Sequence, residues 1–327
     1  MNPRILIAFP LAVLLAACGQ SGPLHTDRAF FGTRVSLDIR AKDSSAARKA
    51  RDEILAELKT LQGILPPASS KPMMRTNLLL ESGEWFSVNP SIYRLIVQSQ
   101  DYYRRSGGRF NPALLGALKQ LRAKQSVRKE GSAPDPTALA QLHKAAPSMN
   151  DIDVDGIRMR NRNPQLRLDF GLLIYGYAAD AEIEHLRALG IHNARVSVGP
   201  VTRVLGSEGS GPWTVAPTQS GPQLHLGDGQ AACVLGGRDS TYQDDLLDLH
   251  TGAPASGTAS AVVVAGTASE AAAACSVLFV GGPEAWHAVT RGLGLKAVQL
   301  RTSDGRVLTG AAMKDLSEGH ENSAQKG

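Results

Sequence analysis

The 327-residue sequence is poor in aromatic residues, which make up 5% of it, although 43% of the residues are hydrophobic. We therefore expect a core built mainly from aliphatic side chains. Charged residues account for only 20%, and together with the hydrophobic content this excludes a wholly disordered chain. The length is sufficient for one large domain or two packed lobes.

The sequence also lacks a strong excess of one charge sign, since 35 basic residues face 30 acidic ones and the formal net charge is +5. The densest basic stretch runs from Lys119 to Lys129 and contains no aromatic residue that could stack on a base. This pattern favours a solvent-exposed helix end over a nucleic-acid surface. We therefore expect no nucleic-acid partner.

Cysteine is scarce, with three residues in the chain, and no Cys-x-x-Cys pair or Cys/His cluster indicates a zinc site. Cys233 and Cys275 lie inside apolar runs, which favours two separate buried thiols. A disulfide between them is the alternative in an oxidising compartment. The eight histidines are scattered, and His185 and His192 are separated by Gly190, where a helix is expected to end.

Long hydrophobic runs are absent after the first twenty residues. At the N-terminus, Arg4 precedes an apolar run from Ile5 to Ala17, which is shorter than the about 20 residues that a membrane-spanning helix needs. Such a run is typical of a secretory signal peptide. It ends in Leu-Ala-Ala-Cys18-Gly19, which resembles a bacterial lipobox. We expect residues 1–17 to be a lipoprotein signal peptide and Cys18 to be lipidated; an ordinary signal peptide is the alternative.

Lipidation determines the expected location of the mature protein. Several acyl chains, at about 0.8 kcal/mol for each buried CH2, would anchor the chain to a bacterial membrane without spanning it. Gly19 after the cysteine slightly favours the outer membrane over the inner one. We expect residues 18–27 to be a tether, the domain to face the periplasm, and the membrane and an envelope protein to be its partners.

Strand and helix patterns alternate along the mature sequence. Strands are expected at residues 34–40, 158–162, 166–170, 194–198, 213–216 and 261–265, with a hairpin at 296–308 that turns at Asp304-Gly305. Helices are expected at residues 46–61, 90–106, 176–189, 267–281 and 283–292. Residues 125–150 read as a polar surface excursion and residues 313–327 as a polar tail. Because hairpins join the late strands, the pattern favours an α+β fold over a doubly wound sheet.

The familiar catalytic motifs are absent: there is no Walker P-loop and no Gly-x-Ser-x-Gly elbow. The glycine-rich residues 206–211 precede a strand rather than a helix, so they cannot place a phosphate at a helix N-terminus.

An ordered set of short segments carries the strongest functional signal. The segments are Phe31-Gly32-Thr33, Arg75-Thr76-Asn77, Gly107-Gly108-Arg109-Phe110-Asn111-Pro112, Leu168-Asp169-Phe170-Gly171, Gly176-Tyr177-Ala178-Ala179-Asp180, Val196-Ser197-Val198-Gly199, Asp248-Leu249-His250-Thr251-Gly252-Ala253-Pro254 and Ser276-Val277-Leu278-Phe279-Val280. In this order, behind a lipobox, they resemble the FAD:protein FMN transferases, the ApbE-like lipoproteins. The resemblance implies one α+β domain of mixed and antiparallel sheets with packed helices over about residues 28–312.

The resemblance also implies a chemistry. In that family FAD is split, and its FMN half is joined through phosphate to a Thr or Ser of a target protein, with a metal ion stabilising the phosphate charge. The resemblance assigns flavin-nucleotide binding to Asn77, Arg109, Phe110 and Asn111. It places the segment from Asp169 to Asp180, including Tyr175, beside the pyrophosphate and the metal. Asp248 and the loop at residues 251–254 would close the cavity.

Several positions depart from the family pattern. The departures are Asn111 in place of Asp, Leu172 in place of Gly, Tyr175 in place of Lys, Asp245 in place of His, Ala272 in place of the metal-binding Asp, and Ser276 in place of Thr. In addition, Gly199-Pro200-Val201 replaces Gly-Gly-Asp, and Leu235-Gly236-Gly237 replaces Thr-Ser-Gly. Leu172 and Tyr175 are expected to narrow the cavity and to weaken FAD binding.

The departures bear directly on catalysis. Mg²⁺ prefers carboxylate oxygens, whereas the aligned metal site keeps only the carbonyl of Ile174 and the hydroxyl of Ser276. We therefore expect no catalytic residue and no bound cofactor, with FAD and Mg²⁺ present only if the family activity is retained. The favoured interpretation is a degenerate, non-catalytic lipoprotein that acts as a binding or accessory factor, for instance in flavoprotein maturation. The alternatives are a working transferase with rearranged ligands, in which His250 or Glu270 compensates, and an unrelated activity in the same pocket.

Overall fold

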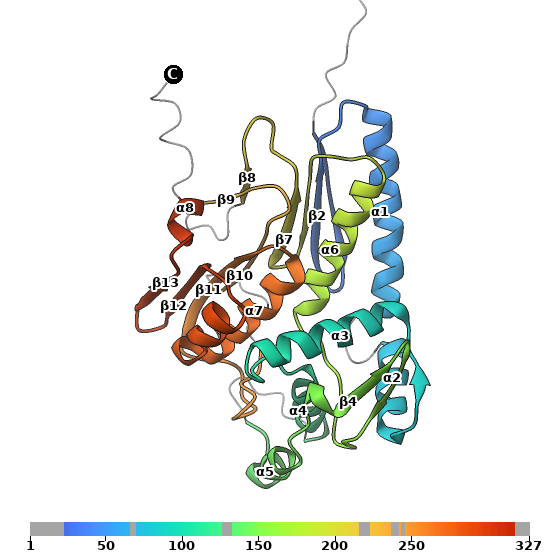
Figure 1. Ribbon diagram of the computed structural model, residues 1–327, viewed down its shortest axis with the longest axis vertical. Helices are drawn as coiled ribbons and strands as arrows, with labels where there is room; N and C mark the ends of the chain where they lie inside the picture. The colour runs from blue at the N-terminus through green and yellow to red at the C-terminus, as the bar shows by residue number, and fades with distance from the viewer. Residues whose placement is uncertain are drawn as a thin grey trace, which may run out of the picture.

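The computed structural model describes residues 23–65, 70–125, 133–215, 223–236, 242 and 246–317. An eight-stranded sheet runs through this part of the chain, and each pair of neighbouring strands is antiparallel (Figure 1). In spatial order the strands are β1 (Leu24–Phe30), β2 (Thr33–Ile39), β6 (Ala194–Val198), β7 (Val201–Leu205), β10 (Ala231–Gly236), β11 (Thr258–Ala265), β12 (Ala297–Thr302) and β13 (Val307–Thr309).

Three helices pack against this sheet: α1 (Ser44–Ile64), α6 (Leu173–Ala188) and α7 (Ala268–Gly281). In Figure 1, α6 and α7 lie in front of the strands and α1 lies beside α6. Side chains alternate along β11, with Val263 in the core beneath these helices and Val262 and Val264 in a second apolar cluster. The second cluster includes the short hairpin of β8 (Trp213–Val215) and β9 (Leu224–Leu226) and the C-terminal α8 (Met313–Ser317). The sheet is therefore covered by apolar side chains on both faces.

The segment between α1 and α6 forms the lower part of the molecule in Figure 1. It contains a three-stranded sheet in the order β3-β5-β4 and several helices. Its elements are α2 (Lys71–Ser82), β3 (Phe86–Ser87), α3 (Pro90–Arg105), α4 (Pro112–Lys124), α5 (Pro136–Ala145), η1 (Met149–Asp151), β4 (Ile152–Asp155) and β5 (Arg158–Asn161). Buried residues of α2, α3 and β5 belong to the same core cluster as those of α6 and α7. One continuous core therefore joins both parts of the chain.

Most of the expected elements are present, and the α+β fold class is confirmed. Asn89 caps α3 by accepting a hydrogen bond from Ser91 N at 2.9 Å, and Thr267 caps α7 by accepting from Glu270 N at 3.2 Å. The late hairpin pairs β12 with β13 around the predicted turn. After α7, the predicted helix at 283–292 is instead a 3-10 turn, η3 (Gly282–Ala285), and a short π-helix, η4 (Ala288–Gly292).

The strand predicted at residues 166–170 is wrong, because this segment is extended but does not pair with any described strand. Its backbone amides bond instead to the start of α4: Arg167 N donates to Ala113 O, and Asp169 N donates to Pro112 O. Four of the described α-helices lie outside the predicted helix ranges, namely α2, α4, α5 and α8. Of these, α5 lies in the predicted surface excursion at 125–150.

The boundaries of the tether and the tail also differ from the prediction. Residues 24–27 of the expected tether belong to β1, which pairs with β2 from Leu24↔Ile39 onward. The expected tail begins with α8, whose Met313 is buried. The predicted signal peptide and Cys18 lie outside the described residues. Within the described residues, no helix is both long enough and apolar enough to span a membrane.

The two internal cysteines are free and buried, as the sequence pattern favoured. Cys233 lies on β10 and Cys275 on the facing side of α7. The Cys275 thiol lies 3.5 Å from the carbonyl oxygen of Cys233 and 3.5 Å from that of Ala261. Burial and the neighbouring Cys275 raise the pKa of the Cys233 thiol, so the uncharged form is favoured.

Candidate functional site

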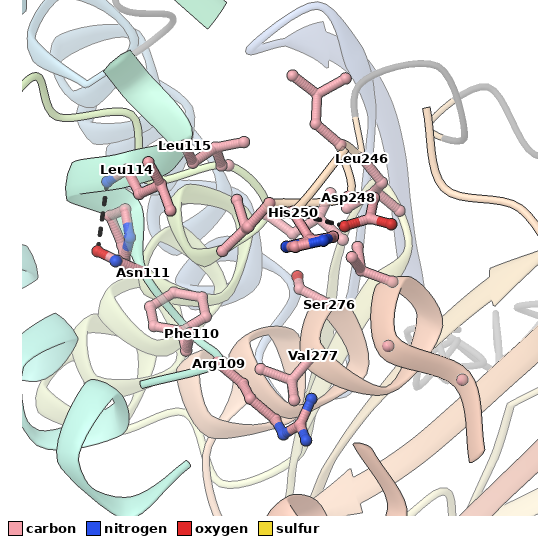
Figure 2. Close-up of a pocket in the computed structure, with 18 of the residues that line it drawn as sticks. Arg109, Phe110, Asn111, Leu114, Leu115, Leu246, Asp248, His250, Ser276 and Val277 are labelled. Carbon is pink, nitrogen blue, oxygen red and sulfur yellow. Dashed lines mark hydrogen bonds between the residues drawn. The ribbon is translucent and has the colours of Figure 1, made fainter. Parts of the chain in front are cut away.

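A cavity of about 1420 Å³ lies where the lower part of the molecule meets α7. Pockets for drug-sized ligands occupy roughly 300–1,000 Å³, so this cavity has room for a dinucleotide. Figure 2 shows Phe110, Asn111, Leu114 and Leu115 on one side of it and Leu246, Asp248 and His250 on the other, with Ser276 and Val277 of α7 between them. Further parts of the wall come from residues 169–172, 174–175, 280–284 and 302–304.

Most of the flavin-site residues predicted from the resemblance line this cavity. They are Arg109, Phe110, Asn111, Asp169, Ile174 and Tyr175, together with Asp248 and Ser276. Leu172 and Tyr175 stand in the wall as expected, but the cavity keeps its large volume with both present. The volume therefore does not exclude FAD.

Asn77 was predicted to bind the nucleotide, yet it is not among the lining residues. Its side-chain amide bonds to both backbone polar groups of Leu168: Nδ2 donates to Leu168 O at 3.1 Å, and Leu168 N donates to Oδ1 at 2.7 Å. The amide therefore fixes the extended segment that carries Asp169. Asn77 acts by positioning this segment rather than by lining the cavity.

Asp169 is 7% exposed and forms an ion pair with Lys119 of α4 at 3.2 Å. The other carboxylate oxygen accepts a hydrogen bond from Gly171 N at 2.9 Å. Lys119 was predicted to lie on a solvent-exposed helix end, but its side chain is only 29% exposed and lines the cavity in contact with Asp169. Nothing in the sequence spacing indicates this contact, since it depends on how α4 lies against residues 167–169.

Asn111 lines the cavity at the N-terminus of α4. Its Oδ1 accepts from Leu114 N at 3.3 Å, and its Nδ2 donates to Pro147 O at 3.0 Å. A carboxylate could accept the first bond but could not donate the second. Asn at the position of the family's Asp therefore has a structural role here, because the bond from its Nδ2 links the start of α4 to the turn before η1.

Asp180 was predicted to lie beside the pyrophosphate, but it is not among the cavity-lining residues. Its carboxylate caps α7, accepting from Ala268 N at 2.7 Å and from Ser269 N at 2.9 Å. The same carboxylate accepts a hydrogen bond from Arg203 at 2.8 Å. Only the first part of the predicted segment, from Asp169 to Tyr175, contributes to the cavity wall.

The positions to which the resemblance assigns the metal contain no charged side chain. Ala272 is fully buried in α7, and the Ser276 hydroxyl donates to Ala272 O at 2.8 Å, back along its own helix. Among the described residues, the cavity brings no three carboxylate, imidazole or thiolate groups close enough to share one ion. Mg²⁺ is usually bound through one or two carboxylates together with substrate phosphates, and neither Ala272 nor Ser276 supplies a carboxylate. Asp245 lies outside the described residues.

The two expected substitutes for the missing groups differ in position. Glu270 lies outside the cavity wall and pairs with Arg105 at 2.7 Å. His250 does line the cavity and stacks on His143 of α5, with ring centroids 5.7 Å apart and planes 8° apart. The His250 backbone amide donates to Asp248 Oδ1 at 2.7 Å (Figure 2). His250 is thus the imidazole that the C-terminal half presents to the cavity.

The loop at residues 251–254 was expected to close the cavity, but the residues just before it do so instead. Residues 246–250 line the wall, whereas 251–254 do not. Arg122 of α4 holds the loop by donating to Gly252 O at 2.8 Å, and His143 contacts Leu249 O at 3.0 Å. The loop therefore anchors the wall to α4 and α5.

Tyr175 and Tyr242 form an edge-to-face pair beside the cavity, with ring centroids 5.8 Å apart. The Tyr242 hydroxyl contacts the Thr33 hydroxyl. A Cβ added to Gly199 would lie only 2.7 Å from the Tyr242 hydroxyl oxygen. Gly199 has a φ of +55°, so both its conformation and its neighbours favour glycine. Tyr175 thus takes part in an aromatic contact at the position where the family has Lys.

The comparisons with known proteins agree with this geometry. The sequence model of the ApbE family matches residues 31–299. An FAD:protein FMN transferase of Rhodobacter capsulatus is 28% identical over 302 residues, covering 89% of this chain and 58% of the relative. The chain thus spans little more than half the length of that relative.

Among solved structures, the apo flavinyl transferase ApbE of Pseudomonas stutzeri matches with a TM-score of 0.77 at 21% identity, over 91% of this chain and 98% of that one. The flavin transferase ApbE of Vibrio cholerae matches with a TM-score of 0.74 at 20% identity, over 90% and 99%. These two likenesses establish the fold, and the sequence match over residues 31–299 establishes that the chain belongs to the ApbE family.

Proposed function

We propose that the protein is a non-catalytic member of the ApbE family, a pseudoenzyme that acts as a binding or accessory factor for an envelope protein in flavoprotein maturation. One observation carries the proposal: the position of the metal-binding carboxylate is a buried methyl group, Ala272, and the neighbouring Ser276 hydroxyl is bonded back to its own helix.

The missing charges matter because FMN transfer moves a phosphoryl group. Charge then spreads over phosphate oxygens, and a metal ion with oriented cations stabilises it. Each lost preorganised contact typically costs about 10²–10³ in rate, although losses in one site are not additive. Ala272 and Tyr175 together leave the aligned positions without the carboxylate and the ammonium. The remaining rate should therefore fall far below that of a working enzyme.

A binding role is supported by what the cavity keeps. Its volume of about 1420 Å³ accommodates a nucleotide-sized ligand. Arg109 lines it, so a positive charge stands in the cavity wall for an anionic group of the ligand. The accessory factor would use this cavity to hold a ligand or a segment of its partner without transferring FMN.

A transfer assay tests the proposal. The purified protein is incubated with FAD, Mg²⁺ and a peptide carrying the family's acceptor Thr, and the peptide mass is followed for added FMN. The Vibrio cholerae transferase serves as the positive control. We expect no metal-dependent addition by the present protein. Addition at a rate comparable to the control would overturn the proposal.

An active Mg²⁺-dependent FAD:protein FMN transferase with rearranged ligands is the second candidate. The contact that favours it is Lys119 beside Asp169, because Lys119 supplies an ammonium to the same cavity wall in which Tyr175 stands at the family's Lys position. If the assay detects transfer, Lys119→Met should then abolish most of it. Transfer that survives this substitution would exclude Lys119 as the substitute.

The proposed location is the periplasmic face of a bacterial membrane, with the outer membrane favoured, through a lipid on Cys18. The proposal is supported by the lipobox-like sequence alone. Fatty-acid labelling of the wild-type protein and of Cys18→Ala tests it. We expect label only on the wild type; equal labelling of both would contradict lipidation at this residue.

A further inference from the structure

Glu182 of α6 is fully buried, and neither of its carboxylate oxygens has a hydrogen-bond partner. Burying an ionised carboxylate without a partner is so costly that the group is either protonated or paired with a cation. Burial and the nearby charge of Glu57 raise the pKa of Glu182 to about 9. No hydrogen bond within the described residues satisfies either oxygen of this carboxylate, so a bound cation would supply the partner that it lacks.

Three further ionisable groups lie at the contact between α1 and α6, which are side by side (Figure 1). His185 follows Glu182 by three residues, so both lie on one face of α6. Glu53 and Glu57 are four residues apart on the facing side of α1, and His185 contacts both: Nδ1 meets Glu57, and Nε2 lies 3.6 Å from Glu53. Glu57, Glu182 and His185 can each offer one ligand atom, and these three atoms all lie within 4.8 Å of one another.

We propose that Glu57, Glu182 and His185 bind one divalent transition-metal ion of the Zn²⁺ type between α1 and α6. One imidazole with two carboxylates is a donor set that suits zinc and its neighbours rather than Mg²⁺. Zinc bonds of about 2.0–2.2 Å place tetrahedral ligands about 3.4 Å apart. The three groups therefore need only small side-chain rotations to surround an ion.

The surroundings permit an ion to enter. The side chains of Glu57 and His185 are 37% and 29% exposed, so the site opens to solvent on that side while Glu182 closes its inner end. Glu53 stands beside His185, where it or a water molecule can complete the shell. None of these residues lines the large cavity. The ion would tie α1 to α6, whose opposite side packs on the sheet.

Metal binding tests the inference directly. The purified protein is stripped with a chelator, titrated with Zn²⁺ alone, desalted, and analysed for metal content and for the midpoint of thermal unfolding. We expect about one tightly held Zn²⁺ per chain and a higher unfolding temperature. Glu182→Gln and His185→Gln should each weaken Zn²⁺ binding by about 100-fold or more. Glu184→Gln is the matched control, because this residue lies on the same turn but contacts Arg187 and Arg203 instead.

A second readout does not depend on the variants. Co²⁺ in place of Zn²⁺ should give the visible absorption of a four-coordinate site in the wild-type protein, and Zn²⁺ should abolish it. Zn²⁺ binding that is equal in the wild type and Glu182→Gln would overturn the inference. So would a stripped protein that takes up neither ion, in which case Glu182 is a protonated core residue.

Discussion

Several polar side chains of the family segments bind backbone rather than a ligand. Asn77 holds Leu168, Asn111 ties α4 to Pro147, and Asp180 caps α7. Each of these bonds shapes or supports the cavity wall without requiring FAD or a metal. Such residues can therefore be retained for their structural role alone, since the fold depends on them.

Lys119 has a measurable structural role in the same wall. Lys119→Met leaves the 7%-exposed Asp169 carboxylate without its ion-pair partner. When one partner of a largely buried ion pair is removed, the other charge stays buried without compensation for its lost hydration. We therefore expect the free energy of unfolding to fall by about 2 kcal/mol. Urea unfolding of wild type and variant measures this loss.

The control for this change is Lys124→Met at the exposed end of the same helix, which should shift the unfolding free energy by no more than about 0.5 kcal/mol. In the double variant with Asp169→Asn, much of the cost should disappear, because no unpaired charge is left. Additive losses would show that the two side chains do not interact.

At the scale of elements, the junction of α6 with α7 depends on close backbone contact. A Cβ on Gly176 would lie 2.5 Å from the carbonyl oxygen of Ala268, which leaves room only for glycine. Four residues later, Asp180 accepts hydrogen bonds from the first amides of α7. Its negative charge also interacts favourably with the helix N-terminus.

Asp180→Ala should therefore destabilise the protein substantially. It removes the two hydrogen bonds that Asp180 accepts from the first amides of α7, although the Thr267 cap remains. It also leaves Arg203, whose side chain is 10% exposed, with only its contact to Glu184. We expect a loss of about 3 kcal/mol, measured by thermal or urea unfolding. Asp180→Asn keeps an oxygen acceptor but no charge, so it should fall between wild type and Ala. No difference between wild type and Ala would show that the cap contributes nothing.

The first strand carries a pH-sensitive contact. His25 of β1 contacts Asp38 of β2 at 2.7 Å and Asp27 at 3.0 Å. Hydrogen bonds, first to Asp38 and then to Asp27, raise the pKa of His25 above 6.5. Because the folded state binds the proton more tightly, the contact stabilises the protein below the unfolded pKa and loses this effect as pH rises through the folded pKa.

His25→Gln should consequently lower the unfolding temperature at about pH 5.5 by about 1–2 °C and have little effect at about pH 9. The effect is small because the His25 side chain is half exposed. Thermal melts of both proteins across this pH range measure it. A difference that grows with pH would have the wrong sign for this contact.

Elements with local signals were the ones that could be predicted from the sequence. The caps at Asn89 and Thr267 and the turn at Asp304-Gly305 depend on residues a few positions apart. The extended segment at 166–170 has strand-like residues, but its partners are Asn77, 91 residues away, and the start of α4. Its true pairing could not be read from local pattern.

The same distinction applies to the sites. The order of the family segments was sufficient to predict that Arg109, Asp169 and Ser276 line one cavity. Lys119 was missed because its partner is set by helix packing. The cluster around Glu182 was also missed, since His185 meets Glu57 across 128 positions of sequence. Contacts between helices that are far apart in sequence leave no spacing pattern.

At the scale of the whole molecule, the sheet and α7 enclose two thiols whose accessibility to a reagent would reveal opening of the core. Cys233 and Cys275 are both fully buried, and reaching either requires separating α7 from β10 and β11. The thiolate is the reactive form, and burial raises the pKa of Cys233. Both thiols should therefore be unreactive in the native protein and become reactive only when the core opens.

Labelling with a maleimide, read by mass, tests this expectation. The native protein should take up no label at Cys233 or Cys275, and the denatured protein should take up label at both. The third cysteine, Cys18, should remain unlabelled even after denaturation if its sulfur carries a lipid, so wild type and Cys18→Ala should give the same number of labels. Rapid labelling of either buried thiol in the native protein would show that α7 detaches from the sheet without global unfolding. An unfolded chain that takes up no label at these two cysteines until a reductant is added would instead mean that they form a disulfide, contrary to the free thiols of the structure.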